Sequence, residues 1–135
     1  MTDIKPVTPD FAVAPQLQPG DMATVAAHGF TLLINNRPDG EAPGQPSGPQ
    51  MAAAAEAAGL HYVAIPVRGG PTPDQVAAMR AAIDGAHGPV LAFCRSGTRS
   101  IFTWSLGEAQ TGARTRAELI ALGQAAGYDL SPALG

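Results

Sequence analysis

The stretch PVLAFCRSGTRSIFTW, residues 89–104, places the only cysteine of the chain, Cys94, between an apolar run and a loop with two arginines. Residues 89–93 are short and apolar, which predicts a buried strand. The segment 99–110 predicts a helix that follows the loop. Because ligands of open α/β sheets bind at the carboxyl ends of the strands, the position of Cys94 predicts a functional site.

Helix and strand patterns alternate along the rest of the chain. Capping residues and apolar spacing predict helices over 19–29, 51–59, 72–88 and 115–130, and strands over 11–14, 30–34 and 61–67. Residues 36–50 are crowded with Pro and Gly and predict a long surface loop. Strands that alternate with helices predict an α/β fold with three layers, a mainly parallel central sheet flanked by helices.

Composition limits the classes of function. A length of 135 residues with 45% hydrophobic residues predicts one compact domain over residues 1–135. The net charge of −3 gives no broad basic surface, so nucleic-acid or membrane partners bound by overall charge are not expected. A single cysteine, an N-terminus unlike a signal peptide and no apolar run of membrane-spanning length predict a cytoplasmic protein. His28, His61 and His87 are scattered, and neither a metal nor a cofactor is expected.

The loop after Cys94 has the composition of an anion-binding cradle. A lone cysteine at a strand end is more often a small buried hydrophobe, but apolar packing needs neither two arginines nor a glycine at that place. Gly97 allows tight curvature, so that successive N–H groups surround the sulfur, and a helix that starts near Ser100 points its positive end there. Arg99 adds a bidentate charge, and these features together favour the thiolate.

Several motifs carry a family resemblance. They are VAPQLQPGD (13–21), GFTLLINNRPDGE (29–41), YVAIPV (62–67), GPVLAFCRSGTRS (88–100) and AGYDL (126–130). With these motifs the chain resembles, almost end to end, the phosphatase-like domain of the beta-lactamase-hydrolase-like proteins, which has a fold similar to that of dual-specificity and tyrosine phosphatases. The resemblance implies a nucleophilic Cys94, an anion-binding Arg99 and a supporting hydroxyl at Ser100. It leaves the reaction open.

The length of the loop favours one reaction over another. Four residues separate Cys94 from Arg99, whereas tyrosine-phosphatase-type enzymes have five, and the shorter loop resembles that of rhodanese-type sulfurtransferases. Phosphomonoester hydrolysis also needs a general acid, and neither candidate, Asp39 or Asp74, lies in a convincing acid motif. The main hypothesis is therefore a sulfurtransferase that carries sulfur as a Cys94 persulfide, from thiosulfate or a small persulfide to an external thiol or cyanide.

Two alternatives stay open beside sulfur transfer. One is a phosphatase-like hydrolase with a phosphocysteine intermediate on Cys94, and the other is a non-catalytic module that binds anions or persulfides. The expected partners are a small anionic sulfur donor and an external thiol, small or on a protein, because no second cysteine is present. A metallo-hydrolase or persulfide-oxidising enzyme is kept open as a further partner.

The substrate-binding residues expected beside the catalytic set Cys94, Arg99 and Ser100 come from two loops. They are Arg95, Ser96, Gly97, Thr98, Arg37 and Asp39. The pair Arg37 and Asp39 has two equally weighted interpretations. The two side chains line the site, or they form a salt bridge with each other that stabilises their loop.

Overall fold

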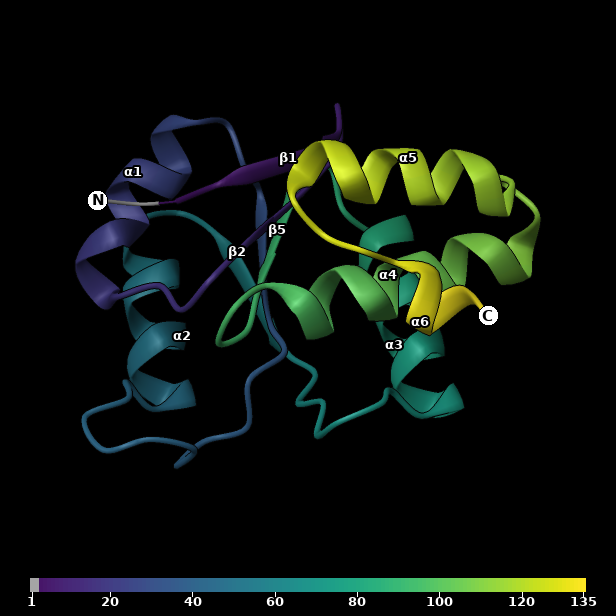
Figure 1. The fold of residues 1–135 in the computed structure, drawn as a ribbon. Helices are drawn as coiled ribbons and strands as arrows, with labels where there is room; N and C mark the ends of the chain where they lie inside the picture. Colours follow the sequence, from purple (N-terminus) through teal and green to yellow (C-terminus); the bar gives the residue numbers. More distant parts are fainter. Residues whose placement is uncertain (1–2) are drawn as a thin grey trace.

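A central sheet organises the chain. The computed structural model describes residues 3–135 and contains a five-stranded sheet in the order β1-β2-β5-β3-β4. The strands are β1 (Lys5–Thr8), β2 (Phe11–Ala14), β3 (Leu32–Asn35), β4 (His61–Ala64) and β5 (Val90–Phe93). β2, β5, β3 and β4 are parallel, and β1 pairs with β2 in the antiparallel direction. The predicted mainly parallel sheet is confirmed (Figure 1).

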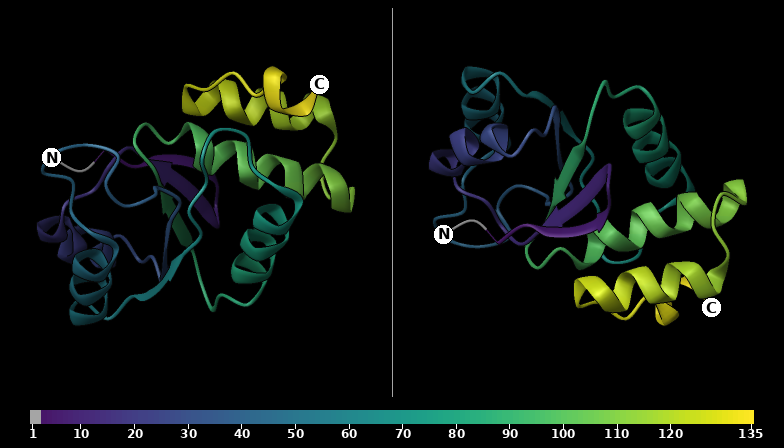
Figure 2. Two further views of the ribbon diagram at one scale, coloured as in Figure 1. Left: turned by 90° about the horizontal axis from the view of Figure 1, so that it is seen from below. Right: turned by 90° about the horizontal axis from the view of Figure 1, so that it is seen from above.

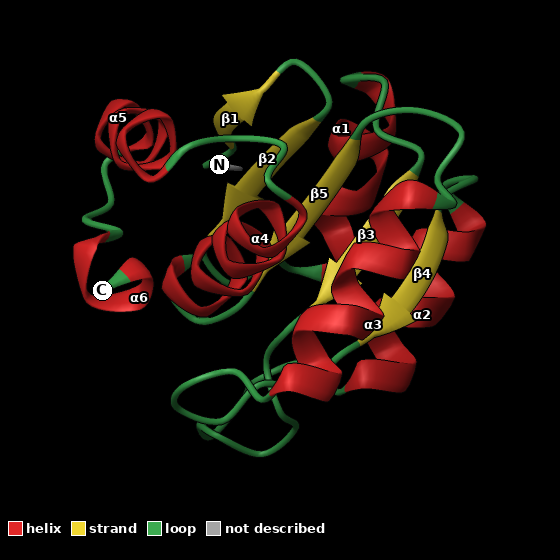
Figure 3. Cartoon of the chain, turned by 90° about the vertical axis from the view of Figure 1, so that its right-hand side faces the viewer, coloured by secondary structure: helices red, strands yellow, loops and turns green. Residues whose placement is uncertain are grey.

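Helices cover both faces of this sheet. They are η1 (Pro19–Asp21), α1 (Met22–Ala27), α2 (Gly48–Ala57), α3 (Pro73–Asp84), α4 (Thr98–Thr111), α5 (Arg116–Ala126) and α6 (Ser131–Leu134). Figure 3 shows α3 and α4 in front of the sheet and α1 and α2 behind it, with α5 and α6 beyond α4. The predicted three-layer α/β architecture is therefore confirmed. None of the helices in residues 3–135 combines the length and the apolar character that a membrane span requires.

Alternate strand residues feed two hydrophobic clusters, one on each face. Val13, Ile34 and Ala92 pack with α3, α4 and α5, whereas Leu33 and Leu91 pack with α1 and α2. This alternation follows from the two-residue period of a strand. Because both faces are covered, the central strands are almost entirely apolar, which is why the short runs in the sequence predict them well.

Helix starts follow side-chain caps more closely than apolar spacing. Ser47, Thr72 and Thr115 each accept a hydrogen bond from the backbone N–H three residues later and open α2, α3 and α5. The sequence placed the start of α2 at Met51, but the Ser47 cap starts the helix at Gly48. The helix after Cys94 also begins earlier than expected, at Thr98, because Gly97 is its N-cap.

Two strand predictions needed correction. β1 was not expected, because its sequence KPVT contains a proline and is too short to show a pattern; it lies at the edge of the sheet, where proline is tolerated. The strand expected over 61–67 ends at Ala64. Beyond it, the N–H groups of Ile65 and Val67 still donate to the carbonyls of Asn35 and Asn36, at 2.9 Å each, so the chain stays beside the end of β3.

The parallel strands bring three separate segments together at the carboxyl end of the sheet. The carboxyl ends of β5, β3 and β4 are neighbours, and Cys94, Asn36 and Ile65 each lie just beyond them. The N–H of Asn36 donates to the carbonyl of Phe93 at 2.8 Å, which ties the second segment to the start of the cysteine loop. The left view in Figure 2, from below, faces this end of the sheet and shows the long loops around it.

Candidate active site

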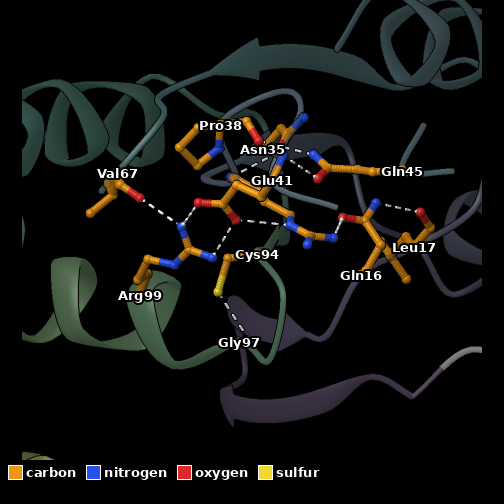
Figure 4. Close-up of polar contacts among 11 residues, drawn as sticks. Gln16, Leu17, Asn35, Pro38, Glu41, Gln45, Val67, Cys94, Gly97 and Arg99 are labelled. Carbon is orange, nitrogen blue, oxygen red and sulfur yellow. Dashed lines mark hydrogen bonds and ion pairs between the residues drawn. The ribbon is translucent and has the colours of Figure 1, made fainter. Parts of the chain in front are cut away.

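Cys94 lies at the bottom of a tight loop between β5 and α4. Its side chain is fully buried, and the backbone N–H of Gly97 donates to its Sγ at 3.1 Å (Figure 4). Gly97 has a φ of +91°, a left-handed conformation that only glycine adopts readily. The loop therefore turns back on the sulfur and starts α4 directly above it, with the positive end of the helix toward the site.

Tyr128 supports this loop from the C-terminal part of the chain. Its hydroxyl donates to the carbonyl of Ser96 at 2.8 Å. A Cβ atom added to Gly97 would lie 2.2 Å from the same hydroxyl oxygen. Burial and the nearby charge of Cys94 raise the pKa of Tyr128 to about 12, so the hydroxyl keeps its proton. Position 97 must consequently be glycine for two separate reasons, backbone conformation and space.

The predicted ring of N–H groups around the sulfur is only partly present. Within residues 3–135 the hydrogen bond to Sγ comes from Gly97, whereas the N–H of Thr98 points to the hydroxyl of Ser96 at 3.4 Å. The Ser96 hydroxyl in turn donates to that of Thr98 at 3.0 Å. The carbonyl of Arg95 accepts from the N–H of Gln16. These contacts hold the loop in shape, and the side chain of Arg95 is exposed beside it.

Arg99, in the first turn of α4, is bound by a carboxylate that the sequence analysis missed. Its Nη1 and Nη2 each donate to Glu41 at 2.8 Å, one to each carboxylate oxygen, and Nη1 also reaches the carbonyl of Val67 at 2.9 Å. The hydrogen bond to Glu41 and the charge of Cys94 raise the pKa of Arg99. Glu41, after β3, and Val67, after β4, thus hold the guanidinium beside the sulfur (Figure 4).

Arg37 binds the same carboxylate from the other side. Its Nε donates to Glu41 at 2.9 Å and its Nη1 to Gln16 at 3.1 Å, and the side chain is 6% exposed. Asp39 accepts instead from the N–H of Gly48 at 2.8 Å. The proposed Arg37–Asp39 salt bridge is therefore wrong. Glu41 lies closer to Arg37 in space, and Asp39 is taken up by the start of α2.

The remaining predicted polar residues lie in the first turns of two helices. Ser100 is completely buried in the first turn of α4, and its hydroxyl has no hydrogen-bond partner among residues 3–135. Asp74 lies exposed in the first turn of α3, where an acidic side chain interacts favourably with the helix dipole. The two candidates for a general acid are thus engaged in the starts of two helices, Asp39 at α2 and Asp74 at α3.

Comparison with known proteins gives the family. The family model described as "Beta-lactamase hydrolase-like protein, phosphatase-like domain" matches residues 3–111, the part that contains the sheet and the cysteine loop. The chain belongs to this family. A beta-lactamase hydrolase-like protein of Agrobacterium fabrum is 41% identical over 122 residues, which cover 90% of this chain and 28% of the relative. The phosphatase-like domain therefore spans between a quarter and a third of that longer protein.

Solved structures support the same fold for the phosphatase-like domain. A candidate phosphatase of Neisseria meningitidis is 34% identical, with a TM-score of 0.85 over 96% of this chain and 92% of its own. Human DUSP28 is 19% identical, with a TM-score of 0.68 over 96% of this chain and 86% of its own, a likeness of fold alone. The fold similar to dual-specificity phosphatases is confirmed. The family match and the Neisseria relative support a cysteine-based phosphatase-like domain, and they do not support the sulfurtransferase hypothesis.

Sequence reasoning missed Glu41 for an identifiable reason. Glu41 lies four residues after Arg37 within the quoted motif NRPDGE, a spacing that hints at the first of its two ion pairs. Its second partner, Arg99, lies 58 residues further along the chain. No local pattern predicts a contact over that separation. Tyr128 was part of the quoted AGYDL motif, but its contact with the cysteine loop was invisible for the same reason.

The Glu41 ion pairs predict a specific pH dependence of stability. The hydrogen bond from Arg99, aided by Arg37 against the opposing effect of burial, lowers the pKa of Glu41 from 4.5 to about 2. A folded-state pKa below the unfolded value contributes stability that is complete above pH 4.5 and is lost as the pH falls toward 2. We expect Glu41→Gln to lower the free energy of unfolding by about 2 kcal/mol at pH 7.

Urea unfolding at pH 7, 4 and 3 measures this effect. The difference between wild type and Glu41→Gln should shrink steadily over that series. Glu56→Gln, at an exposed position on α2, is the control and should stay within about 0.5 kcal/mol of wild type at pH 7. A Glu41→Gln difference that is equally large at pH 7 and pH 3 would mean that the charge of Glu41 does not stabilise the fold.

Proposed function

We propose that this domain is a cysteine-dependent, phosphatase-like hydrolase of small phosphomonoesters. The observation that carries the proposal is the placement of Cys94 at the bottom of a loop whose Gly97 N–H points at the sulfur, with the Arg99 guanidinium held alongside. A tetrahedral dianion needs these features, a nucleophile below it and fixed positive charge beside it. The family and the Neisseria relative support this hydrolase, which was the alternative hypothesis from the sequence.

The reaction has two steps. The Cys94 thiolate attacks phosphorus, a P–S bond forms, and the P–O bond to the leaving group breaks with the electron pair on oxygen. Water then attacks the phosphocysteine, the P–S bond breaks, and phosphate and the thiolate are released with the proton of water. Arg99 and the N–H of Gly97 stabilise the charge that develops on the transferred group and on sulfur. The hydroxyl of Ser100, in the first turn of α4, has no hydrogen-bond partner among the described residues and is a candidate donor to the departing thiolate.

The state of the carboxylates near Cys94 limits which leaving groups the enzyme can expel quickly. Glu41 has a pKa of about 2 and is held by two arginines, so it is ionised at neutral pH and has no proton to donate. Asp39 and Asp74 lie at the starts of α2 and α3. Since general acids contribute about 10²–10⁴-fold in rate, substrates whose leaving oxygen needs a proton should react slowly.

A leaving-group series tests this proposal. We expect kcat/KM for 4-nitrophenyl phosphate to exceed that for phenyl phosphate by about 10²-fold or more, because the nitrophenolate leaves without protonation. Phosphate release is the measurement, with trapping of a phosphorylated Cys94 by rapid acid quench and mass spectrometry. Similar values for the two esters would show that a general acid operates. Absence of both turnover and phosphocysteine would contradict the hydrolase.

Sulfur transfer is a second candidate, favoured by the four-residue loop between Cys94 and Arg99 and by the ionised Glu41, which has no proton to donate to a leaving oxygen. In that reaction the thiolate attacks the outer sulfur of thiosulfate, the S–S bond breaks and sulfite leaves, and an external thiolate or cyanide later takes the sulfur. Intact-protein mass spectrometry after incubation with thiosulfate distinguishes the two candidates. A gain of one sulfur on wild type but not on Cys94→Ser, without phosphatase turnover, would replace the hydrolase by the sulfurtransferase.

A further inference from the structure

Two arginines of the chain have no acceptor within residues 3–135. Arg37, Arg80, Arg99 and Arg114 all bind carboxylates, and Arg116 donates to the carbonyl of Gly135. Arg68 and Arg95 take part in no ion pair or hydrogen bond of their side chains in the described part of the chain. Arg68 follows β4 and Arg95 follows β5. Because these strands are parallel, both arginines lie at the carboxyl end of the sheet, as Cys94 does.

Arg68 and Arg95 each line a hollow at this end of the sheet. The first, of about 420 Å³, contains Glu41 together with Arg95 and Arg99, two residues of the segment that follows Cys94. The second, of about 460 Å³, contains Arg68 and Tyr62 between apolar walls. Those walls are formed by Pro38, Pro49, Ala52, Ala64 and Pro66. A hollow with apolar walls and a few polar groups is typical of a small-molecule site.

Arg37 connects the two hollows. It lines both, and its guanidinium shares the oxygen Oε1 of Glu41 with Arg99, at 2.9 Å and 2.8 Å. Figure 4 shows Glu41 beside Arg99, and Pro38, a wall residue of the second hollow, lies close to Glu41 in the same view. A molecule held at Cys94 and Arg99 would therefore have the second hollow next to it.

The polar groups of the second hollow suit an anion. Arg68 provides a positive charge that forms no ion pair within residues 3–135. The hydroxyl of Tyr62, which accepts from Asn35 at 3.0 Å, has a hydrogen left to donate. Asp39 also lines this hollow, with one carboxylate oxygen bound by the N–H of Gly48. Over both hollows together, four arginines face two carboxylates, although the chain as a whole carries a net charge of −3.

We propose that the hollow lined by Arg68, Tyr62 and Arg37 binds a second anionic group of the substrate, a carboxylate or a further phosphate, on a short apolar linker. This inference rests on the proposed function, because it places the reacting phosphoryl group at Cys94. The planar guanidinium of Arg68 can bind either oxyanion in a bidentate manner. The substrate class is thus a small phosphomonoester whose leaving group carries its own negative charge.

Matched substrates and variants test this site. Initial rates are measured with 4-carboxyphenyl phosphate, benzene-1,4-diyl bisphosphate and phenyl phosphate, on wild type, Arg68→Gln and Arg116→Gln. The preference is the ratio of kcat/KM for a charged ester to that for phenyl phosphate. We expect Arg68→Gln to lower this ratio about tenfold, as for loss of one charge-assisted hydrogen bond. Arg116→Gln removes an arginine charge on α5 and should leave the ratio unchanged. The two charged esters distinguish carboxylate from phosphate.

A binding measurement keeps this proposal separate from the catalytic one. The same compounds are titrated calorimetrically into Cys94→Ser, with and without Arg68→Gln. Tighter binding of a charged ester that depends on Arg68, without turnover by wild type, would support the second anion site and overturn the hydrolase. Turnover without an Arg68-dependent preference in rate or binding would overturn the second anion site alone. Neither turnover nor Arg68-dependent binding would overturn both.

Discussion

A Cys94→Ser variant should lose phosphatase turnover by about four orders of magnitude or more. Removing the nucleophile of a covalent mechanism costs on this scale, because the serine hydroxyl is not ionised at neutral pH and is a far weaker nucleophile than a thiolate. The measurement is kcat/KM with 4-nitrophenyl phosphate. In the same variant no phosphorylated side chain should accumulate at position 94.

The fold of Cys94→Ser should survive, which makes the test interpretable. Serine is close in size to cysteine, and the N–H of Gly97 can donate to its hydroxyl as it does to Sγ at 3.1 Å. Urea unfolding and binding of inorganic phosphate control for folding and for the anion site. A non-catalytic binding module predicts a different pattern, in which wild type has no turnover and both proteins bind phosphate equally. Turnover retained in the variant would remove Cys94 from the mechanism.

Gly97→Ala is expected to have the second largest effect, although it adds one methyl group. A left-handed conformation costs a residue with a Cβ about 1–2 kcal/mol, and the new methyl would also lie 2.2 Å from the hydroxyl oxygen of Tyr128. The loop must change shape or displace Tyr128, and either movement shifts the N–H that points at the sulfur. We expect a loss of kcat/KM of about 10²-fold or more, in line with the sensitivity of catalysis to small misplacements.

A double-mutant cycle separates the two causes. Tyr128→Phe removes the hydroxyl that a Cβ at position 97 would meet, but the left-handed φ of +91° remains. In the Tyr128→Phe background, Gly97→Ala should cost less activity than in wild type, with a remainder due to the backbone. Gly20→Ala is the matched control, since a Cβ there meets nothing within 4 Å and its φ is not left-handed. Equal losses in both backgrounds would show that contact with Tyr128 is not responsible.

Local patterns in the sequence predicted the fold class and the elements around Cys94. The apolar run before Cys94, the glycine after it and the helix pattern beyond correctly predicted the strand, the loop and the helix that surround the sulfur. Alternating strand and helix patterns predicted the α/β class, because a sheet covered on both faces leaves apolar runs that are easy to recognise. The quoted motifs, CRSGTRS and NRPDGE among them, pointed to the family that the comparisons found.

The tertiary structure decided which of the predicted polar residues meet. Arg37 and Asp39 are two residues apart and were weighed as a pair, yet Arg37 binds Glu41 and Asp39 binds the start of α2. Edge position likewise determined β1, which has a partner on one side only and no apolar pattern of its own.

Neighbouring residues encode strands, helices and tight turns, so the cysteine loop and the class of fold could be predicted from the sequence. Only the tertiary structure decided that Glu41 holds Arg99, that Tyr128 closes over Gly97 and that Arg68 lines a second hollow. The physical reason is that these contacts join residues far apart in the sequence. Parallel strands bring their carboxyl ends together only through long crossover connections, so residues as distant in the chain as Gln16 and Arg95 meet at one site without any local pattern that records it.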